Sequence, residues 1–177
     1  ALARFFRISL SGGRNIIPVR EELEHVKNYL MIQEMRYKNK FRYEIQAQPE
    51  TLELSTIKLM LQPIVENAIY HGMEYMEDSG TILVTAETRD GDLWIVVSDN
   101  GLGMTPEQAA KLLTGDPLRP ETTRRKPGSG VGLKNVQSRI HLYFGEQYGL
   151  TIDSEPDEGT KVIIRPPAIP YGTMEES

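Results

Sequence analysis

The chain has 177 residues, with 25 acidic and 20 basic side chains and a formal net charge of −5. This length is typical of one domain, which can bury a core without metals or disulfides. The absence of cysteine excludes a disulfide scaffold, thiolate zinc sites and cysteine catalysis. The acidic balance argues against broad nucleic-acid binding, so we expect no nucleic-acid partner. We also expect no signal peptide, and no apolar run approaches the roughly 18 residues of a membrane span.

The first part of the chain has two helical patterns followed by a strand. Residues 1–10 have the pattern of a helix end. A second helix is expected from Pro18, with Glu21 and Glu22 near the positive end of its dipole. Residues 41–47 alternate as a strand. The apolar stripe of the second helix consists of Val19, Leu23, Val26 and Leu30.

The rest of the chain mixes helices with strand pairs. A helix is expected from Thr56, capped by Ser55 or Thr56, with a kink or break at Pro63. A strand pair is joined by a turn around Asp90-Gly91. The remaining predicted elements are strands at 81–87, 93–98, 150–154 and 160–165, helices at 106–113 and 131–144, a mobile loop at 114–127, and a frayed tail at 166–177.

The first polar motif interrupts the end of the apolar helix. Asn67 and His71 are four residues apart, which places them on one face of a helix, and Glu66 is one step round. A side-chain amide oxygen is a hard donor suited to Mg²⁺. The motif therefore fits ligands around a metal-bound polyphosphate, although an exposed polar helix end is the alternative.

The second motif is Asp99-Asn100-Gly101-Leu102-Gly103-Met104, directly after an apolar strand. Glycines two apart suit a place where backbone approaches a flat ligand closely. An ionised Asp accepts hydrogen bonds and does not donate them, so it would select the exocyclic amine of adenine over the carbonyl of guanine. An ordinary Asx turn is the alternative.

The third motif is Gly128-Ser129-Gly130-Val131-Gly132-Leu133, which opens a helix. Free N–H groups at a helix start point towards an anion, and the helix dipole adds to the attraction. A flexible hinge is the alternative. The motif is neither a Walker loop nor a dinucleotide fingerprint, because it lacks the Gly-Lys-Ser/Thr sequence and no strand precedes it.

In this order and spacing, the three motifs resemble the nitrogen box and glycine boxes of the GHKL ATPase superfamily, which includes gyrase-type ATPases, Hsp90 and histidine kinases. Gly159-Thr160 fits the last small box, and the resemblance covers roughly residues 41–165. Residues 17–30 and 61–72 are similar to LytS/YesM-type sensor histidine kinases. The resemblance implies an α/β fold: a two-layer sandwich of the GHKL (Bergerat) type, with a mixed β-sheet covered by helices on one face.

The resemblance also implies ATP and Mg²⁺ as cofactors and assigns site residues. Asn67 would hold Mg²⁺ on the phosphates, Glu66 would orient water or metal beside it, and His71 would lie near the phosphates. Asp99 would accept the adenine amine, supported by Thr160 through water. The chain would pass under the base at Gly101 and Gly103, a lid would run from Met104 to Pro127, and the residues closing on the phosphates would be Gly128, Gly130, Val131, Gly132 and Leu133.

The implied function is the catalytic ATP-binding domain of a two-component sensor histidine kinase. It would transfer the γ-phosphoryl group to a histidine upstream, for relay to a response regulator. The alternatives are a GHKL ATPase that drives conformational change and a nucleotide-binding regulatory module without kinase activity. The phosphoacceptor motif of the family is absent, and neither His25 nor His141 replaces it. A cation that reaches the γ-phosphate could come from the loop 114–127 or from Arg139.

The implied organisation places the end of a dimerisation helix and a hinge at 1–15 and a linking helix at 16–40. The catalytic domain would follow at 41–166, with a flexible tail at 167–177. The expected partners are the protein's own upstream dimerisation and phosphoacceptor domain, a second copy in a homodimer, and a cognate response regulator. The expected location is the cytoplasmic side of a bacterial inner or plasma membrane.

Overall fold

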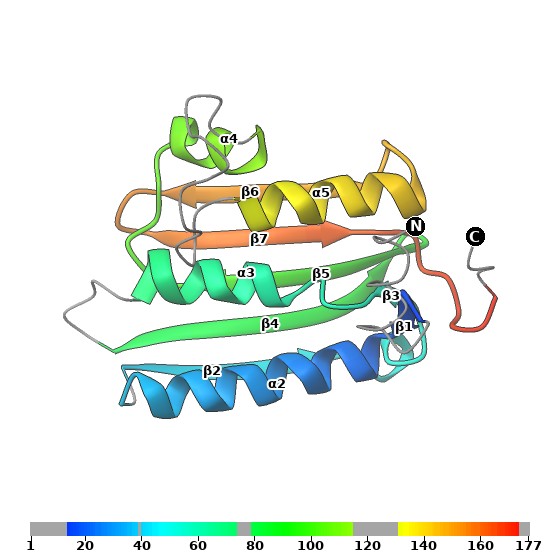
Figure 1. Ribbon diagram of the computed structural model, residues 1–177, viewed down its shortest axis with the longest axis horizontal. Helices are drawn as coiled ribbons and strands as arrows, with labels where there is room; N and C mark the ends of the chain where they lie inside the picture. Colours follow the sequence, from blue (N-terminus) through cyan, green and yellow to red (C-terminus); the bar gives the residue numbers. More distant parts are fainter. Residues whose placement is uncertain (1–13, 39, 74–78, 115–130, 174–177) are drawn as a thin grey trace, which may run out of the picture.

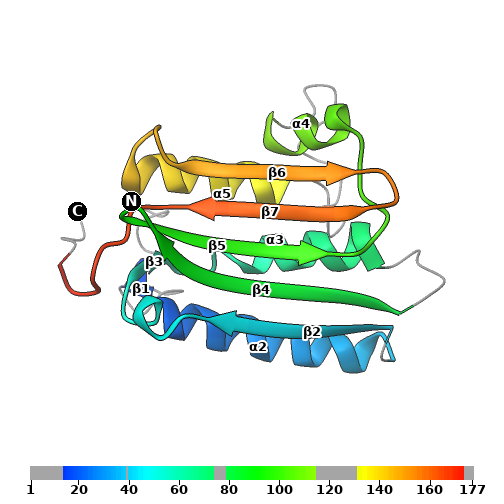
Figure 2. The same cartoon turned by 180° about the vertical axis from the view of Figure 1, so that it is seen from behind.

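A mixed five-stranded sheet forms one layer of the protein (Figures 1 and 2). The computed structural model describes residues 14–38, 40–73, 79–114 and 131–173. The strand order is β2-β4-β5-β7-β6; β2 pairs with β4 in parallel, and the other pairs are antiparallel. The bounds are β2 Phe41–Ala47, β4 Gly80–Arg89, β5 Asp92–Asp99, β6 Gly149–Glu155 and β7 Gly159–Arg165.

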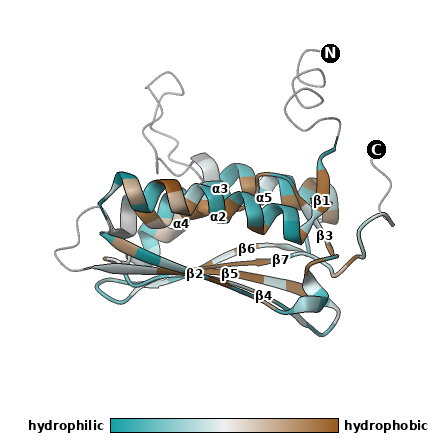
Figure 3. Cartoon of the chain, turned by 90° about the horizontal axis from the view of Figure 1, so that it is seen from below, coloured by the Kyte–Doolittle hydropathy of each residue, from teal (hydrophilic) through white to brown (hydrophobic). Residues whose placement is uncertain are grey.

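The second layer consists of helices on one face of this sheet (Figure 3). It contains α2 (Val19–Arg36), α3 (Gln62–Asn67), the π-helix η2 (Ala68–Met73) and α5 (Val131–Phe144), with α4 (Pro106–Thr114) packed against α5. The 3-10 helix η1 (Pro49–Thr51) and a small sheet of β1 (Ile16–Pro18) and β3 (Ser55–Ile57) complete the described elements. The predicted two-layer α/β sandwich is confirmed. None of the helices in the described ranges is long and apolar enough to span a bilayer.

The core lies between the two layers because the inward side of each strand alternates with a more exposed side. The predicted apolar stripe of α2 is fully included in this core. The sheet contributes buried residues from all five of its strands, among them Ile82, Val84, Leu93, Ile95, Val97, Val162 and Ile164, and α5 contributes Leu133, Val136 and Ile140.

The helix predicted from Thr56 begins instead at Gln62. Residues Ser55–Ile57 pair with β1 as strand β3, and a turn follows in which Leu59 has a φ of 59°. Pro63 consequently lies in the first turn of α3, where a missing N–H is tolerated. The helix therefore starts near Pro63 rather than bending there.

The segment 166–173 is held by backbone hydrogen bonds, which differs from the predicted frayed tail. The Ala168 N–H donates to the Gly91 carbonyl over 3.0 Å, and the Ser55 N–H donates to the Ile169 carbonyl over 2.7 Å. Residues 174–177, and the helix end predicted at 1–10, lie outside the described residues.

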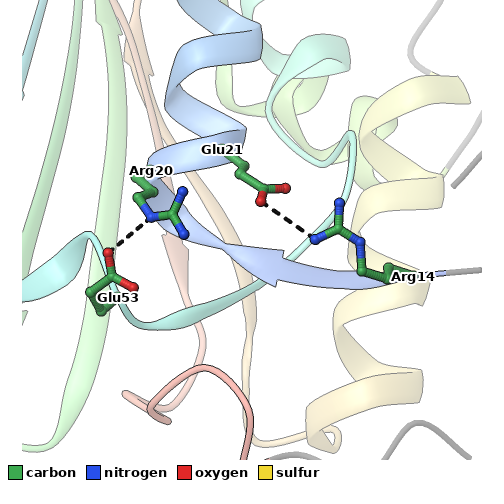
Figure 4. Close-up of polar contacts among 4 residues, drawn as sticks. All are labelled: Arg14, Arg20, Glu21 and Glu53. Atoms are coloured by element: carbon green, nitrogen blue, oxygen red, sulfur yellow. Dashed lines mark hydrogen bonds and ion pairs between the residues drawn. The ribbon is translucent and has the colours of Figure 1, made fainter. Parts of the chain in front are cut away.

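The start of α2 is fixed by one buried contact and two exposed ones. The exposed ion pairs join Arg14 to Glu21 at 3.4 Å and Arg20 to Glu53 at 2.9 Å (Figure 4), and such pairs stabilise a fold by less than about 1 kcal/mol. The carboxylate of Glu22, in contrast, is buried and accepts the N–H groups of Leu59 at 2.9 Å and Leu61 at 3.0 Å. Burial raises the pKa of Glu22. Glu22 thus joins α2 to the turn that precedes α3.

Replacing Glu22 by Ala should lower the free energy of unfolding by about 2–4 kcal/mol, because two backbone N–H donors lose their acceptor. Urea denaturation measures this loss. Glu24→Ala is the matched control, since Glu24 is exposed on the same helix and its loss should change stability by at most about 0.5 kcal/mol. Equal stabilities of the two variants would show that the Glu22 contact contributes nothing.

Candidate nucleotide-binding site

The Asp99 carboxylate lies at the end of β5, opposite Thr160 on the neighbouring β7. Its Oδ1 accepts the Gly101 N–H over 2.9 Å. Burial raises the pKa of Asp99 to about 6, although hydrogen bonds from the backbone N–H groups of Gly101 and Thr160 act in the opposite direction. At neutral pH the carboxylate is therefore ionised and presents acceptors only.

A serine that the sequence analysis did not identify supports this end of the site. The Ser154 hydroxyl donates to the Gly159 carbonyl at 2.9 Å and accepts the Met104 N–H at 2.9 Å. Its oxygen lies 2.8 Å from the Thr160 hydroxyl. Because the single Ser154 proton is used on Gly159, Thr160 is the donor in that pair and keeps its lone pairs as acceptors. Ser154 is paired with Thr160 in the β6–β7 hairpin. The pairing register of the two predicted strands was therefore the signal that could have identified Ser154.

Glycines hold the segment after β5 tightly against the β6–β7 hairpin. Gly103 has a φ of 67°, and a Cβ there would lie 1.9 Å from the Glu155 carbonyl oxygen. Gly159 has a φ of 87°, and a Cβ there would lie 2.1 Å from the Asp99 carbonyl oxygen. Both positions therefore need glycine for the fold itself, whatever their contacts with a ligand. Gly101 and Met104, between these contacts, are buried.

The polar motif at the end of α3 includes a buried oxygen without a partner. Asn67 is 4% exposed, and its Oδ1 has no hydrogen-bond partner among the described residues. Orphaned buried acceptors are rare in folded proteins and often indicate an absent ion or water. Glu66 precedes it and is partly exposed.

The backbone changes from α-helix to π-helix directly after Asn67. His71 lies within this η2 segment, and the expected shared face of Asn67 and His71 stays a prediction. The His71 side chain lies outside the described part of the structure. The η2 helix contacts β5 and β7, which carry Asp99 and Thr160, so the first motif and the second share one region of the sheet.

The third motif brings the start of α5 against α3. A Cβ at Gly132 would lie 2.9 Å from the Cβ of Pro63, so glycine permits this close approach. Leu133 is buried and Val131 is the first residue of α5. Gly128 and Gly130 lie outside the described residues, as do the loop cations Arg119, Arg124, Arg125 and Lys126 and most of the predicted lid.

Arg139 has a structural contact in addition to its predicted candidacy for the γ-phosphate. Its Nη2 donates to the Lys58 carbonyl over 2.7 Å, in the turn that Glu22 also holds. The contact joins α5 to the segment before α3.

A pair of glycine substitutions separates backbone strain from steric overlap. Gly91→Ala should lower stability by about 1–2 kcal/mol, because Gly91 has a φ of 81° but open space where a Cβ would lie. Gly159→Ala carries similar strain and also overlaps the Asp99 carbonyl, so we expect a further loss of about 2 kcal/mol. Urea denaturation of both variants tests this difference. Equal losses would mean that the hairpin moves away from β5 without cost.

Comparison with known proteins identifies the family. Residues 54–170 match the family described as histidine kinase-, DNA gyrase B-, and HSP90-like ATPase, and residues 1–41 match the histidine kinase family. The chain is 34% identical to sensor histidine kinase YesM of Bacillus subtilis, over 94% of this chain and 26% of YesM. It is 31% identical to sensor protein LytS of the same species, over 99% of this chain and 28% of LytS. The chain thus spans about a quarter of the length of these curated relatives.

Solved histidine kinase structures share the fold. A mycobacterial sensor histidine kinase, MprB, has a TM-score of 0.60 and 20% identity, covering 88% of this chain and 99% of that one. The catalytic domain of histidine kinase ThkA has a TM-score of 0.62 and 18% identity, covering 88% and 97%. The matches to YesM and LytS confirm the resemblance found in the motifs. The chain belongs to the family of histidine kinase-, DNA gyrase B- and HSP90-like ATPases, with the ATP-binding domain at residues 54–170.

Proposed function

We propose that this chain is the catalytic part of a sensor histidine kinase, which transfers the γ-phosphoryl group of Mg-ATP to a histidine on another segment. The observation that carries the proposal is the pairing of two kinds of acceptor in one region. The half-buried Asp99 carboxylate suits a base, and the orphaned Asn67 oxygen suits a cation. The helix that continues from Asn67 packs on the strands that carry Asp99 and Thr160.

The Asp99 end of the site would select adenine. An ionised carboxylate accepts a hydrogen bond from the exocyclic amine of adenine, whereas the carbonyl of guanine offers it no proton. Thr160, whose proton is used on Ser154, adds an acceptor towards the same ligand, directly or through water. Discrimination against guanine follows from the unpaired acceptor that a guanine base would leave buried.

The Asn67 end of the site would hold the phosphates. The Asn67 amide oxygen fits Mg²⁺, which binds through one or two protein oxygens together with substrate phosphates and water. When bound, Mg²⁺ supplies neutralisation of the phosphate charge. The start of α5, held beside Pro63 by Gly132, presents backbone N–H groups and the positive end of the helix dipole to the same anion.

The transfer itself relies on positioning and charge neutralisation. A neutral imidazole on a separate segment attacks the γ-phosphorus, and ADP leaves as its bond to that phosphorus breaks. Glu66 lies beside Asn67 and orients the metal, a water or the incoming imidazole. The family match over residues 1–41 favours a kinase over an ATPase that only changes conformation.

The same proposal includes the partners expected for such a kinase. The relatives YesM and LytS are named as sensor proteins, and the chain spans only part of their length. We therefore infer a phosphoacceptor and dimerisation domain in the same protein, a homodimer, and a response regulator that receives the phosphoryl group. Bacterial sensor relatives support a place on the cytoplasmic side of a membrane.

Adenosine binding should weaken about tenfold between pH 7 and pH 5, because Asp99, with a pKa of about 6, becomes protonated over this range. Adenosine is the suitable probe since it carries no titrating phosphate, and NMR titration measures its affinity. The folded-state pKa is raised, so ionising Asp99 also lowers the stability of the free domain as the pH rises through 6.

The Asp99→Asn variant should bind adenosine weakly at both pH values, without the pH dependence. Asp153→Asn is the control, because Asp153 is exposed on β6. An unchanged pH profile in Asp99→Asn would assign the titration to another group.

Asn67→Ala should remove the Mg²⁺-dependent part of ADP affinity and abolish transfer of labelled phosphate from ATP in the full-length kinase. ADP binding without Mg²⁺ should persist, which shows that the variant folds. Calorimetry with and without Mg²⁺ and detection of acid-labile phosphate are the measurements, with exposed Asn28→Ala as the matched control. Full transfer by Asn67→Ala would overturn the proposed site.

A further inference from the structure

A row of polar side chains on α2 faces the helix that carries Glu66. Glu22, His25 and Tyr29 are three and four residues apart, so they share one side of α2. His25 Nε2 lies 2.8 Å from Gln62 Oε1, at the first residue of α3. Gln62 Nε2 in turn donates to Glu66 Oε1 over 3.0 Å. The contacts form a continuous chain from α2 to Glu66.

The chemistry of Glu66 determines the direction of every bond in this chain. A carboxylate only accepts, so Gln62 must present its NH₂ group to Glu66. The amide oxygen of Gln62 therefore faces His25, and the His25 ring must carry its proton on Nε2 and donate it. Reversing either of these hydrogen bonds would leave a donor facing a donor or an acceptor facing an acceptor.

We propose that His25 is a positioning residue, which fixes the Glu66 carboxylate through Gln62 for phosphoryl transfer. The inference deepens the proposed function and rests on it, because it concerns the use of Glu66. A partly exposed glutamate has several accessible rotamers, and a bond to the residue one helical turn earlier selects one of them. Gln62 has the same freedom unless its oxygen is also held, and His25 supplies that bond.

The Glu66 carboxylate also lies close to α2 at Tyr29. Burial is the main cause of the raised pKa of Tyr29, and the charge of Glu66 adds to it, which places that charge near the Tyr29 phenol. Tyr37, which directly follows α2, packs edge-on against Tyr70 of η2, with ring centroids 6.2 Å apart. The carboxylate therefore lies along the seam between the two helices.

The hydrogen-bonded relay of His25, Gln62 and Glu66 keeps one register, because Glu22 holds α2 against the residues just before α3. Its carboxylate holds Leu59 and Leu61, and Gln62 is the next residue. A shift of α2 along its axis would break the His25–Gln62 bond. A carboxylate held by one oxygen still has acceptor positions on the other, so the relay leaves Glu66 able to act on metal, water or imidazole.

Autophosphorylation of the full-length kinase tests the relay. His25→Phe keeps a ring but removes the donor, and Gln62→Met keeps the length but removes both polar ends. Each should lower the rate at saturating ATP by about tenfold while the KM for ATP stays within about twofold. His25→Gln, whose amide N–H can donate to Gln62, should restore at least about half of the rate. Because glutamine cannot accept a phosphoryl group, this rescue also shows that His25 is not the phosphoacceptor.

Three comparisons decide the outcome. The double variant His25→Phe/Gln62→Met should be no slower than Gln62→Met, since both changes break one chain, whereas multiplied losses would overturn the relay. Asn28→Ala, exposed on the same helix, should transfer at the wild-type rate, and a loss equal to that of His25→Phe would assign the effect to α2 in general.

Loss of transfer in Glu66→Gln with normal rates in both single relay variants would overturn the relay and leave the proposed function intact. Normal transfer in Glu66→Gln would overturn the role of Glu66 and the relay together, while Asn67→Ala tests the proposed function separately.

Discussion

The turn between β3 and α3 is the point from which the helical layer is positioned. Its Leu59 and Leu61 N–H groups bind the Glu22 carboxylate of α2, and its Lys58 carbonyl accepts the Arg139 side chain of α5. Leu59 has a φ of 59°, an unusual conformation for a residue with a side chain, which persists where flanking contacts hold the backbone. This short segment thus contacts α2 and α5 and leads directly into α3, which carries Glu66 and Asn67.

The two ends of the candidate site are held in different ways. The base end depends on backbone packing, because Gly103 and Gly159 let the segment after β5 touch the β6–β7 hairpin. The phosphate end depends on side chains between helices, through Glu22 and the contact of Gly132 with Pro63. If the proposed function holds, small movements of the helices would therefore alter phosphate contacts and leave adenine recognition unchanged.

Local patterns in the sequence predicted the strands of the five-stranded sheet well, because alternation and turn residues are properties of neighbouring positions. The Asp90-Gly91 turn, with positive φ at both residues, is one example. The start of α3 was predicted wrongly because the spacing of Ile57, Met60 and Leu61 suits a helix but is equally satisfied by a buried strand and a turn. That choice depends on pairing with β1, which lies nearly forty residues away in the chain.

The motifs likewise predicted the residue types of the candidate site but not the contacts that position them. Ser154 and Gln62 act through partners brought close by the fold, and Glu22 looked only like a residue suited to the helix dipole. These roles require knowledge of which elements are adjacent. The site assignments themselves remain predictions, and the geometry supplies reasons for Asp99 and Asn67 in particular.

The hydrogen-bond satisfaction of a polar group, taken together with its place in the fold, separates structural roles from ligand roles. Glu22 has two backbone donors within hydrogen-bond distance and serves the fold. Asp99 also receives two N–H groups, yet its pKa of about 6 shows that they do not fully offset its burial, and a further donor would stabilise its charge.

Asn67 is the extreme case, since its Oδ1 has no described partner. Lack of a partner is not sufficient by itself, because Gln33, Ser55 and Thr56 also have unpaired buried oxygens, in elements without a ligand motif. What distinguishes Asn67 is that the helix continuing from it packs on the strands of Asp99 and Thr160. An adenine amine at one acceptor and a cation at the other would satisfy both, so the free domain carries a cost in stability that its nucleotide would offset.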